Sequence, residues 1–555
     1  MTETLRGIGV SAGTATGPLA RMGRAPRLPA NPPPVHSTDE ETLRARAALA
    51  GVSEWLQRRA ATLTGDAADI LVAESLMAAD PALAVAVEKR VLDGRPAPWA
   101  VSEALAGYQQ TLIAAGGYLA ERAADLDDIA NRAVALLLAE PMPGLPTPGH
   151  PYVLAAEDLA PADTATLDPT QVLAIVTERG GPTSHTAILS KSLGIPAVVS
   201  CREIADVAEG TVLGVDGSAG TVLVDPSSGE VAGLRDRAAA RAARRASSHG
   251  PGRTRDGHPV KLLVNIGGAS DVASVIEAEA EGVGLFRTEF LYLDRADAPA
   301  VEEQVEAYRR VFGPLDGRKI VVRTLDAGAD KPLAFAPQPG EPNPALGMRG
   351  YRLDRLHHGL LDDQLEAISV AARDTAADVW VMAPMIATEA EAAAFTGAAR
   401  RHGLPVAGVM IEVPAAALGA ARILAHADFV SLGTNDLSQY TFAADRQVGQ
   451  LAALLDPWQP ALLHLVAATA TAATAARKPV SVCGEAASDP LLAVVLAGLG
   501  VTSLSMAAGS VADVRAALAG TTLEGCRAAA RAALEVGDPD AARAAVASIA
   551  GPQPG

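Results

Sequence analysis

The second half of the chain alternates short apolar strands with helical segments, and this alternation constrains the fold more than any other feature. The strand candidates are Lys261–Ile266, Gly282–Glu289, Lys319–Leu325, Val379–Met385, Ala407–Glu412, Phe429–Asn435, Val480–Gly484 and Ser503–Met506. Eight strand–helix units in about 300 residues match the number and length of a (β/α)8 barrel. The sequence therefore predicts a barrel, with an open doubly wound sheet as the alternative.

The first half of the chain has a different pattern. Residues 38–140 are rich in Ala, Leu and Arg, which is typical of helices, and short strand patterns lie on both sides of this stretch. We therefore expect an α/β domain that contains an inserted helical subdomain, followed by a linker helix and the barrel. The expected bounds are 1–22 and 141–225 for the α/β domain, 23–140 for the helical subdomain, 226–254 for the linker helix and 255–555 for the barrel.

Composition excludes several classes of protein. The 555 residues carry a net charge of −18, so a nucleic-acid surface, which needs basic patches, is not expected. Three cysteines are too few for a disulfide framework. The N-terminus lacks the basic and apolar regions of a signal peptide, and no run of about 18 uncharged apolar residues indicates a membrane span. A cytoplasmic protein without membrane insertion is predicted.

Polar residues occupy the C-terminal ends of the predicted barrel strands, which meet on one rim in this fold. They are Asn265, Arg287, Arg323, Met385, Glu412, Asn435, Asp436, Cys483 and Ser505. Arginines bind phosphate and carboxylate groups through paired hydrogen bonds, and two carboxylates with open coordination positions suit Mg²⁺. The rim therefore predicts a site for an anionic substrate and a divalent metal.

A histidine before the barrel has a distinctive setting. His185 lies in the segment GGPTSHT, residues 180–186, and an apolar helical run, Ala187–Leu193, follows it. We therefore expect the imidazole at a helix start, where backbone N–H groups and the helix dipole favour negative charge. This placement suits a phosphoryl carrier, although a lone histidine is more often a helix cap or a buried side chain.

Several motifs resemble those of one known family. The stretch GGPTSHTAILSKSLGIPAVV, residues 180–199, resembles the active-histidine signature of the phosphoenolpyruvate-using phosphotransferases. Six barrel motifs are similar, in the same order, to those of the Enzyme I family of the bacterial sugar phosphotransferase system. They are GLFRTEFL (284–291), RTLDAGADK (323–331), NPALGMRG (343–350), GVMIEVP (408–414), SLGTNDLSQYTFAADR (431–446) and SVCGE (481–485).

The resemblance implies a fold and a set of roles. The fold is multidomain α/β: a swivelling phosphohistidine domain with an inserted helical carrier-binding subdomain, then a C-terminal (β/α)8 barrel. The implied roles are His185 as the nucleophile, Cys483 as the proton donor to the enolate, Glu412 and Asp436 as ligands of Mg²⁺, and Arg287, Arg323, Asn435 and Arg446 as phosphoenolpyruvate contacts supported by Arg349.

The same resemblance predicts a reaction and partners. No nucleotide-binding motif precedes His185, and the helical insertion resembles the subdomain that binds the small carrier protein HPr. We therefore expect the phosphoryl group of phosphoenolpyruvate to pass through phospho-His185 to a histidine of HPr, releasing pyruvate, as the first step of sugar transport. A homodimer through the barrel is also implied. The alternatives are a phosphotransferase that serves another carrier, as in a dihydroxyacetone pathway, and a non-catalytic paralogue that senses phosphoenolpyruvate.

Overall fold

The computed structural model divides the chain into two compact units. The described residues are 2–23, 26–29, 31–60, 74–115, 123–140, 143–146, 148–159, 167–181, 185–293, 295, 297–328, 333–336, 341–446 and 448–550. The larger unit comprises Met1–Gly17, Leu173–Val207 and Thr211–Gly555, and the smaller unit comprises Pro18–Val172 and Ala208–Gly210. No helix among the described residues is long and apolar enough to cross a membrane.

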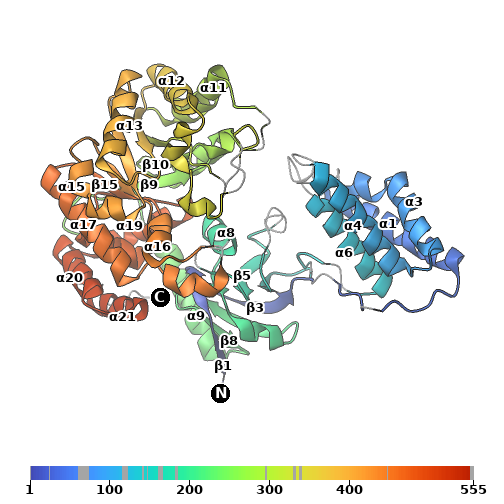
Figure 1. Ribbon diagram of the computed structural model, residues 1–555. Coiled ribbons are helices and arrows are strands. Elements are labelled where there is room, and N and C mark those ends of the chain that lie inside the picture. The colour runs from blue at the N-terminus through green and yellow to red at the C-terminus, as the bar shows by residue number, and fades with distance from the viewer. Residues whose placement is uncertain are drawn as a thin grey trace. The chain divides into compact units, whose positions relative to one another are not determined.

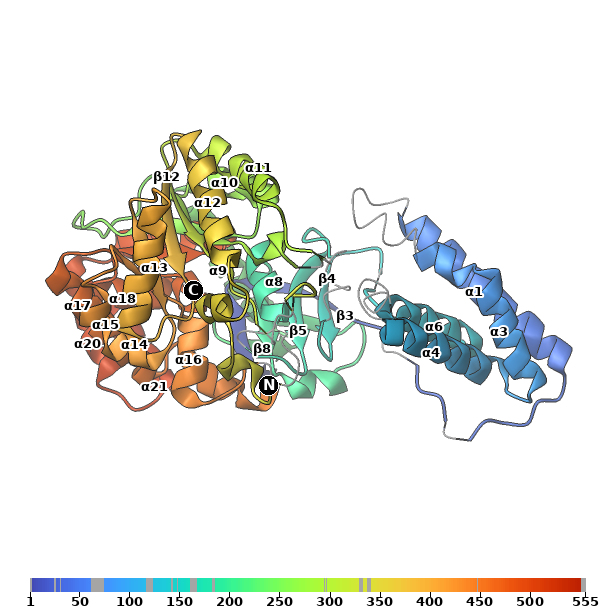
Figure 2. The same ribbon diagram turned by 45° about the horizontal axis from the view of Figure 1, so that its top comes forward.

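The smaller unit is mainly helical in its described part. Helices α1 (Thr38–Ala60), α3 (Pro81–Leu92), α4 (Ala97–Ala115) and α6 (Ala123–Leu138) lie side by side (Figures 1 and 2). Helix α3 begins after Asp80, whose carboxylate accepts a hydrogen bond from the Ala82 amide at 2.8 Å. The buried core of this bundle includes Leu56, Val91, Leu105 and Ile129. The helical pattern predicted for this stretch is therefore confirmed where the structure describes it.

Short strands precede and follow the helical segment in the sequence. In the smaller unit, β4 (Tyr152–Ala156) runs parallel to the end of β3 (Thr14–Arg21). The larger unit contains β1 (Glu3–Arg6), β2 (Ile8–Ser11), β5 (Val172–Thr177), β6 (Ala197–Val199), β7 (Val212–Asp216) and β8 (Thr221–Val224). Strands β1 and β7 pair antiparallel with β8, while β6 pairs antiparallel with β2 and parallel with β5.

Two helices of the larger unit belong to this part of the chain. Helix α8 (His185–Leu193) lies between β5 and β6 in the sequence, and α9 (Ser228–Ala246) leads to the barrel. A capping box starts α9: the Ser227 hydroxyl accepts from the Glu230 amide at 3.4 Å, and the Glu230 carboxylate accepts from the Ser227 amide at 2.7 Å. The helix expected from the Arg- and Ala-rich sequence is thus present.

The rest of the larger unit is a closed barrel of parallel strands, as the sequence predicts (Figure 1). The strands are β9 (Lys261–Ile266), β10 (Gly282–Arg287), β11 (Lys319–Arg323), β12 (Asp378–Ala383), β13 (Ala407–Ile411), β14 (Val430–Leu432), β15 (Val480–Val482) and β16 (Ser503–Met506). They pair in chain order, and β16 closes the barrel on β9. Several predicted strands extend one to three residues too far at their C-terminal ends, because the chain turns into loops and helix starts at the rim.

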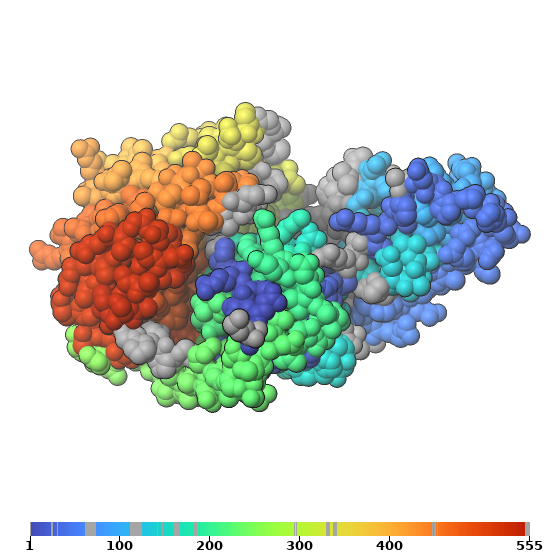
Figure 3. Space-filling view, turned by 90° about the horizontal axis from the view of Figure 1, so that it is seen from below, coloured from blue at the N-terminus to red at the C-terminus, as the bar shows by residue number. Residues whose placement is uncertain are grey.

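Helices and short 3-10 turns surround the barrel. The helices are α10 (Val272–Glu277), α11 (Val301–Phe312), α12 (Leu360–Arg373), α13 (Glu389–Arg401), α14 (Pro414–Leu418), α15 (Ala420–Ile423), α16 (Thr434–Phe442), α17 (Pro460–Ala476), α18 (Pro490–Gly498), α19 (Val511–Gly520), α20 (Leu523–Leu534) and α21 (Pro539–Ala550). The 3-10 turns around the barrel are η2 (Ala269–Asp271), η3 (Glu289–Leu291), η4 (Gly313–Leu315), η5 (Pro344–Leu346), η6 (Gly350–Arg355), η7 (Gly449–Leu455), η8 (Glu485–Ser488) and η9 (Ala508–Ser510), while η1 (Arg202–Asp206) lies between β6 and β7 in the sequence. Helices α20 and α21 lie at the surface of this unit, red in Figure 3.

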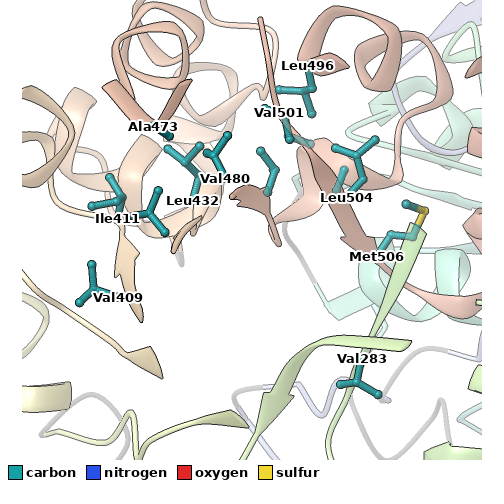
Figure 4. Packing of buried hydrophobic residues seen from close by; sticks show 14 of the residues in the cluster. Val283, Val409, Ile411, Leu432, Ala473, Val480, Leu496, Val501, Leu504 and Met506 are labelled. Carbon is teal, nitrogen blue, oxygen red and sulfur yellow. The ribbon is translucent and has the colours of Figure 1, made fainter. Parts of the chain in front are cut away.

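Side chains alternate between the two sides of the barrel wall, because successive residues of a strand point in opposite directions. Val409 and Ile411 of β13 belong to the core between the strands and the helices, where Figure 4 also places Leu432 and Leu496. Met410, between them in the sequence, belongs to a separate buried cluster inside the barrel. The same alternation continues beyond the strand ends and decides which rim residues face inward.

Candidate active site

His185, the candidate phosphoryl carrier, is the first residue of a helix. Helix α8 begins at His185, so the prediction of a helix start is confirmed. The His185 side chain and residues 182–184, whose hydroxyl groups are the expected capping groups, lie outside the described part of the structure. Farther along the helix, Lys191 forms an ion pair with Glu485, the last residue of the cysteine motif of the barrel.

The structure brings the predicted barrel residues to the C-terminal ends of the strands. Arg287 and Arg323 are the last residues of β10 and β11, and Glu412 and Cys483 directly follow β13 and β15. Asn435, Asp436 and Arg446 belong to α16 and the segment after it, while Arg349 directly precedes η6. Asn265 of β9 donates a hydrogen bond to the Cys483 carbonyl at 3.2 Å. The rim expected from the strand ends is therefore a real structural feature.

Arg323 stands in a buried network of charges. Its side chain is 7% exposed; one guanidinium nitrogen lies 2.5 Å from Glu289 Oε1 and another lies 3.0 Å from Asp326 Oδ2. Burial acts to lower the pKa of Arg323, but the charges of Glu289 and Asp326 outweigh it, so the pKa is raised. The guanidinium therefore stays charged inside the rim.

The network continues from Asp326 to the aspartate of α16. Arg349 Nε lies 3.2 Å from Asp326 Oδ1, and Arg349 Nη1 lies 3.0 Å from Asp436 Oδ1. Arg446 Nη1 lies 3.6 Å from the other oxygen of Asp436. Buried charges of opposite sign thus alternate across the rim, an arrangement that can exchange internal partners for ligands of either sign.

Glu412 accepts a backbone hydrogen bond from an unusual residue. The Met385 amide donates to Glu412 Oε1 at 2.6 Å, and Met385 itself has a φ of 57°, which a side chain of this size rarely adopts. Burial, followed by the charges of Asp436 and Asp326, raises the pKa of Glu412 to about 7. The carboxylate is held in place by the backbone but lacks enough positive charge nearby to favour its ionised form.

The Cys483 thiol is buried and has a raised pKa. Burial raises this pKa to about 11. The Cys483 amide donates to the Leu432 carbonyl at 3.0 Å, which fixes the residue beside β14. A thiol of this kind stays protonated near neutral pH, so it suits the role of a proton donor better than that of a nucleophile.

The loop after Cys483 closely approaches the start of α16. The Glu485 amide donates to Asn435 Oδ1 at 3.1 Å, which orients the Asn435 side chain. Between these residues, a Cβ added to Gly484 would lie 1.9 Å from Thr434 Oγ1 and 2.9 Å from the Thr434 backbone nitrogen. Glycine is therefore required here by close packing against α16.

Gly484→Ala should destabilise the protein by about 1–3 kcal/mol, the usual cost of forcing an extra methyl group into a packed site. The measurement is the free energy of unfolding in denaturant. Gly520→Ala is the matched control, because a Cβ at Gly520 meets nothing within 4 Å. Equal stability of the two variants would contradict the packing described here.

Sequence reasoning missed several contributors to the site. Asp326 is predicted only as part of a motif, and the expected strand Gly282–Glu289 includes Glu289, which lies in η3. The sequence predicts no role for Tyr440, whose hydroxyl lies 3.3 Å from Arg349 Nη1. The contact of the Met385 amide depends on backbone geometry, which leaves little trace in the sequence. Glu289 carried one signal: it follows Arg287 by two residues, the spacing that returns a side chain to the same face of an extended chain.

Together with the closed parallel barrel, this rim defines an enzyme that acts on an anionic substrate. Comparison with protein families agrees with this class. Residues 241–523 match the PEP-binding domain of the PEP-utilising enzymes, residues 148–220 match their mobile domain, and residues 6–122 match their N-terminal domain.

Relatives extend the match over the whole chain. A phosphoenolpyruvate-protein phosphotransferase of Streptomyces coelicolor is 53% identical over 552 residues, which cover 99% of each chain. Its counterpart in Enterococcus faecalis is 37% identical over 93% of this chain and 94% of its own, and that of Bacillus subtilis is 36% identical over 92% and 94%. The chain therefore belongs to the phosphoenolpyruvate-protein phosphotransferase family of PEP-utilising enzymes, as its motifs predict.

Proposed function

We propose that this enzyme transfers the phosphoryl group of phosphoenolpyruvate to His185 and then to a histidine of the carrier HPr, releasing pyruvate. The observation that carries the proposal is the rim, where the buried, charged Arg323 and the protonated Cys483 thiol belong to one barrel end. An anion pocket and a proton donor are the two groups that conversion of phosphoenolpyruvate to pyruvate needs. Membership of the family supports the same reaction.

The proposed first step breaks the bond between phosphorus and the enol oxygen. Neutral His185 attacks phosphorus through one ring nitrogen, and the electron pair of the broken bond leaves on the enolate oxygen. Arg287, Arg323 and Arg446, with Asn435, hold the substrate anion and balance the charge that spreads over the transferring group. Cys483 then gives its proton to the methylene carbon of the enolate, and pyruvate forms.

The residues present fit a divalent metal of the Mg²⁺ type. Among the described residues, no group of three or more His, Cys, Asp or Glu side chains forms a metal cluster. Mg²⁺, however, needs only one or two carboxylates when a substrate phosphate supplies further oxygens. Burial and the nearby charge of Asp436 raise the pKa of Glu412, so a cation beside this carboxyl group would favour its ionised form. We propose that Glu412 and Asp436 hold Mg²⁺, which would neutralise phosphate charge when bound.

Transfer to a carrier requires His185 to meet two different partners. We propose that the domain bearing α8 swings between the barrel rim and HPr, which docks on the helical subdomain. The ion pair between Lys191 of α8 and Glu485 supports an approach to the rim, because Glu485 also fixes Asn435. The net charge of −18 suits a carrier with a basic face. Dimerisation through the barrel and a cytoplasmic location belong to the same proposal.

The test is pyruvate release coupled to carrier phosphorylation. Purified enzyme, Mg²⁺ and phosphoenolpyruvate should give a stoichiometric burst of pyruvate, and addition of HPr should make the release continuous. Saturable binding of phosphoenolpyruvate without any pyruvate would instead identify a sensor. A burst that another carrier, but not HPr, converts to turnover would identify the related phosphotransferase that serves a different pathway.

Cys483→Ala should lower turnover by about 10²–10⁴-fold, the usual contribution of a general acid. Phosphoenolpyruvate should still bind, because the arginines remain. Cys526→Ala is the matched control, since Cys526 is also a buried thiol but lies in α20. Pyruvate release by the two variants, measured side by side, checks the role, and equal rates would contradict it.

A further inference from the structure

Arg349 forms ion pairs with two carboxylates, Asp326 and Asp436. Asp436 is a proposed ligand of Mg²⁺, whereas Asp326 is not. The Arg349 side chain is 1% exposed, and Nη1 lies 3.0 Å from Asp436 Oδ1. The other two nitrogens, Nε and Nη2, lie 3.2 and 3.3 Å from the two oxygens of Asp326. The guanidinium therefore makes a two-pronged contact with Asp326, while Nη1 contacts both Asp436 and the Tyr440 hydroxyl at 3.3 Å.

The contact of Nη1 with Asp436 occupies the carboxylate that the metal would need. A guanidinium nitrogen and a divalent cation that share one carboxylate repel each other, and this repulsion is strong in a buried site. Asp436 also lies 3.6 Å from Arg446, so its charge is balanced by arginines in this structure. A cation that enters at Asp436 therefore meets the opposing charge of Arg349 on the same carboxylate.

We propose that Arg349 competes with the divalent cation for Asp436 and that Asp326 retains the guanidinium once the cation has bound. This inference rests on the proposed function, because it takes Asp436 as a metal ligand. Arg349 thus acts as a built-in counter-ion that keeps the cation affinity of the substrate-free enzyme low. The nitrogen released from Asp436 becomes available to the substrate phosphate, so that cation and anion favour each other's binding.

The surroundings of Arg349 allow this exchange with little rearrangement. Asp326 is fully buried and also pairs with Arg323 at 3.0 Å, so its position is fixed from two sides. The next residue, Gly350, donates its amide to the Ala327 carbonyl at 2.9 Å, which ties the backbone beside Arg349 to the Asp326 segment. Nη1 can therefore leave Asp436 while the two-pronged contact with Asp326 remains.

The experiment is Mn²⁺ binding to the full chain without substrate, followed by the electron paramagnetic resonance signal of free Mn²⁺. Arg349→Gln should bind Mn²⁺ about tenfold more tightly than the wild type, the scale of one charge-assisted hydrogen bond. Asp326→Asn should bind it more weakly, because a guanidinium that has lost its second partner stays on Asp436. In the Arg349→Gln background, Asp326→Asn should have little further effect.

Controls separate this inference from a general effect of charge and from the proposed metal site. Arg355→Gln removes an arginine of η6 whose side chain is 63% exposed, and it should leave the affinity unchanged. Thermal unfolding checks that each variant folds, and Arg349→Met provides a second test if the glutamine variant does not.

If Glu412→Gln and Asp436→Asn weaken Mn²⁺ binding but Arg349→Gln does not strengthen it, the inference alone is overturned. Simply additive effects of Arg349→Gln and Asp326→Asn would also overturn it, since they would mark Arg349 as a distant charge. If neither the wild type nor Arg349→Gln takes up Mn²⁺, the metal site itself fails, and the inference with it.

Discussion

His185→Ala should abolish phosphoryl transfer to the carrier while leaving phosphoenolpyruvate binding intact. His185 is the nucleophile of the proposed mechanism, so no residual route to the carrier is expected. The measurements are pyruvate release in the presence of HPr and Mg²⁺, and substrate binding by calorimetry. The expected loss exceeds about 10⁴-fold, as it does when the nucleophile of a covalent mechanism is removed.

The matched control is His249→Ala. His249 is an exposed histidine that contacts Glu279 at 2.9 Å, away from the strand ends that carry the site. This variant should transfer at the wild-type rate. A His185→Ala enzyme that still supplied phosphoryl groups to HPr would show that the phosphoryl group travels by another residue.

Arg323→Gln should reduce both activity and stability. Loss of the guanidinium removes a contact to the transferring phosphoryl group, for which we expect a decrease of about 10²–10³-fold in turnover. It also removes the buried ion pairs that Arg323 forms with Glu289 and with Asp326. Breaking such a pair costs about 3–5 kcal/mol. Turnover and the free energy of unfolding should be measured on the same preparation, so that activity is corrected for the folded fraction.

An exposed arginine provides the comparison. Arg309 pairs with Asp374 on the surface, where its side chain is 44% exposed, and Arg309→Gln should change stability by no more than about 0.5 kcal/mol. Turnover of this variant should equal that of the wild type. An Arg323→Gln enzyme with wild-type turnover would remove Arg323 from the substrate site.

The strands of the barrel could be predicted because their pattern is local. Each is a short apolar run bounded by turns, so the order and number of strands, and hence the closed barrel, follow from the sequence. The residues at which the strands end could be predicted less accurately. Asn435 was expected in a strand but lies in α16, because the chain turns into a helix as soon as it leaves the rim.

The membership of the site could be predicted, but its internal pairing could not. The residues at the C-terminal ends of the predicted strands, together with the family motifs, identify the arginines and carboxylates that meet at the rim. They could not show that Arg349 contacts both Asp326 and Asp436, since these residues lie 23 and 87 positions away from it. Nor could they show that the Met385 amide holds Glu412. Such contacts depend on backbone conformations and side-chain directions that the folded structure alone fixes.

The most direct test of the account is the location of phosphorus after reaction with labelled phosphoenolpyruvate and Mg²⁺. We expect one label per chain on the peptide that contains His185, lost in acid and retained in base, as for a phosphorus–nitrogen bond. Addition of HPr should remove that label and place it on the carrier. A label that resists acid, or that maps to a peptide without His185, would contradict phosphoryl transfer through His185.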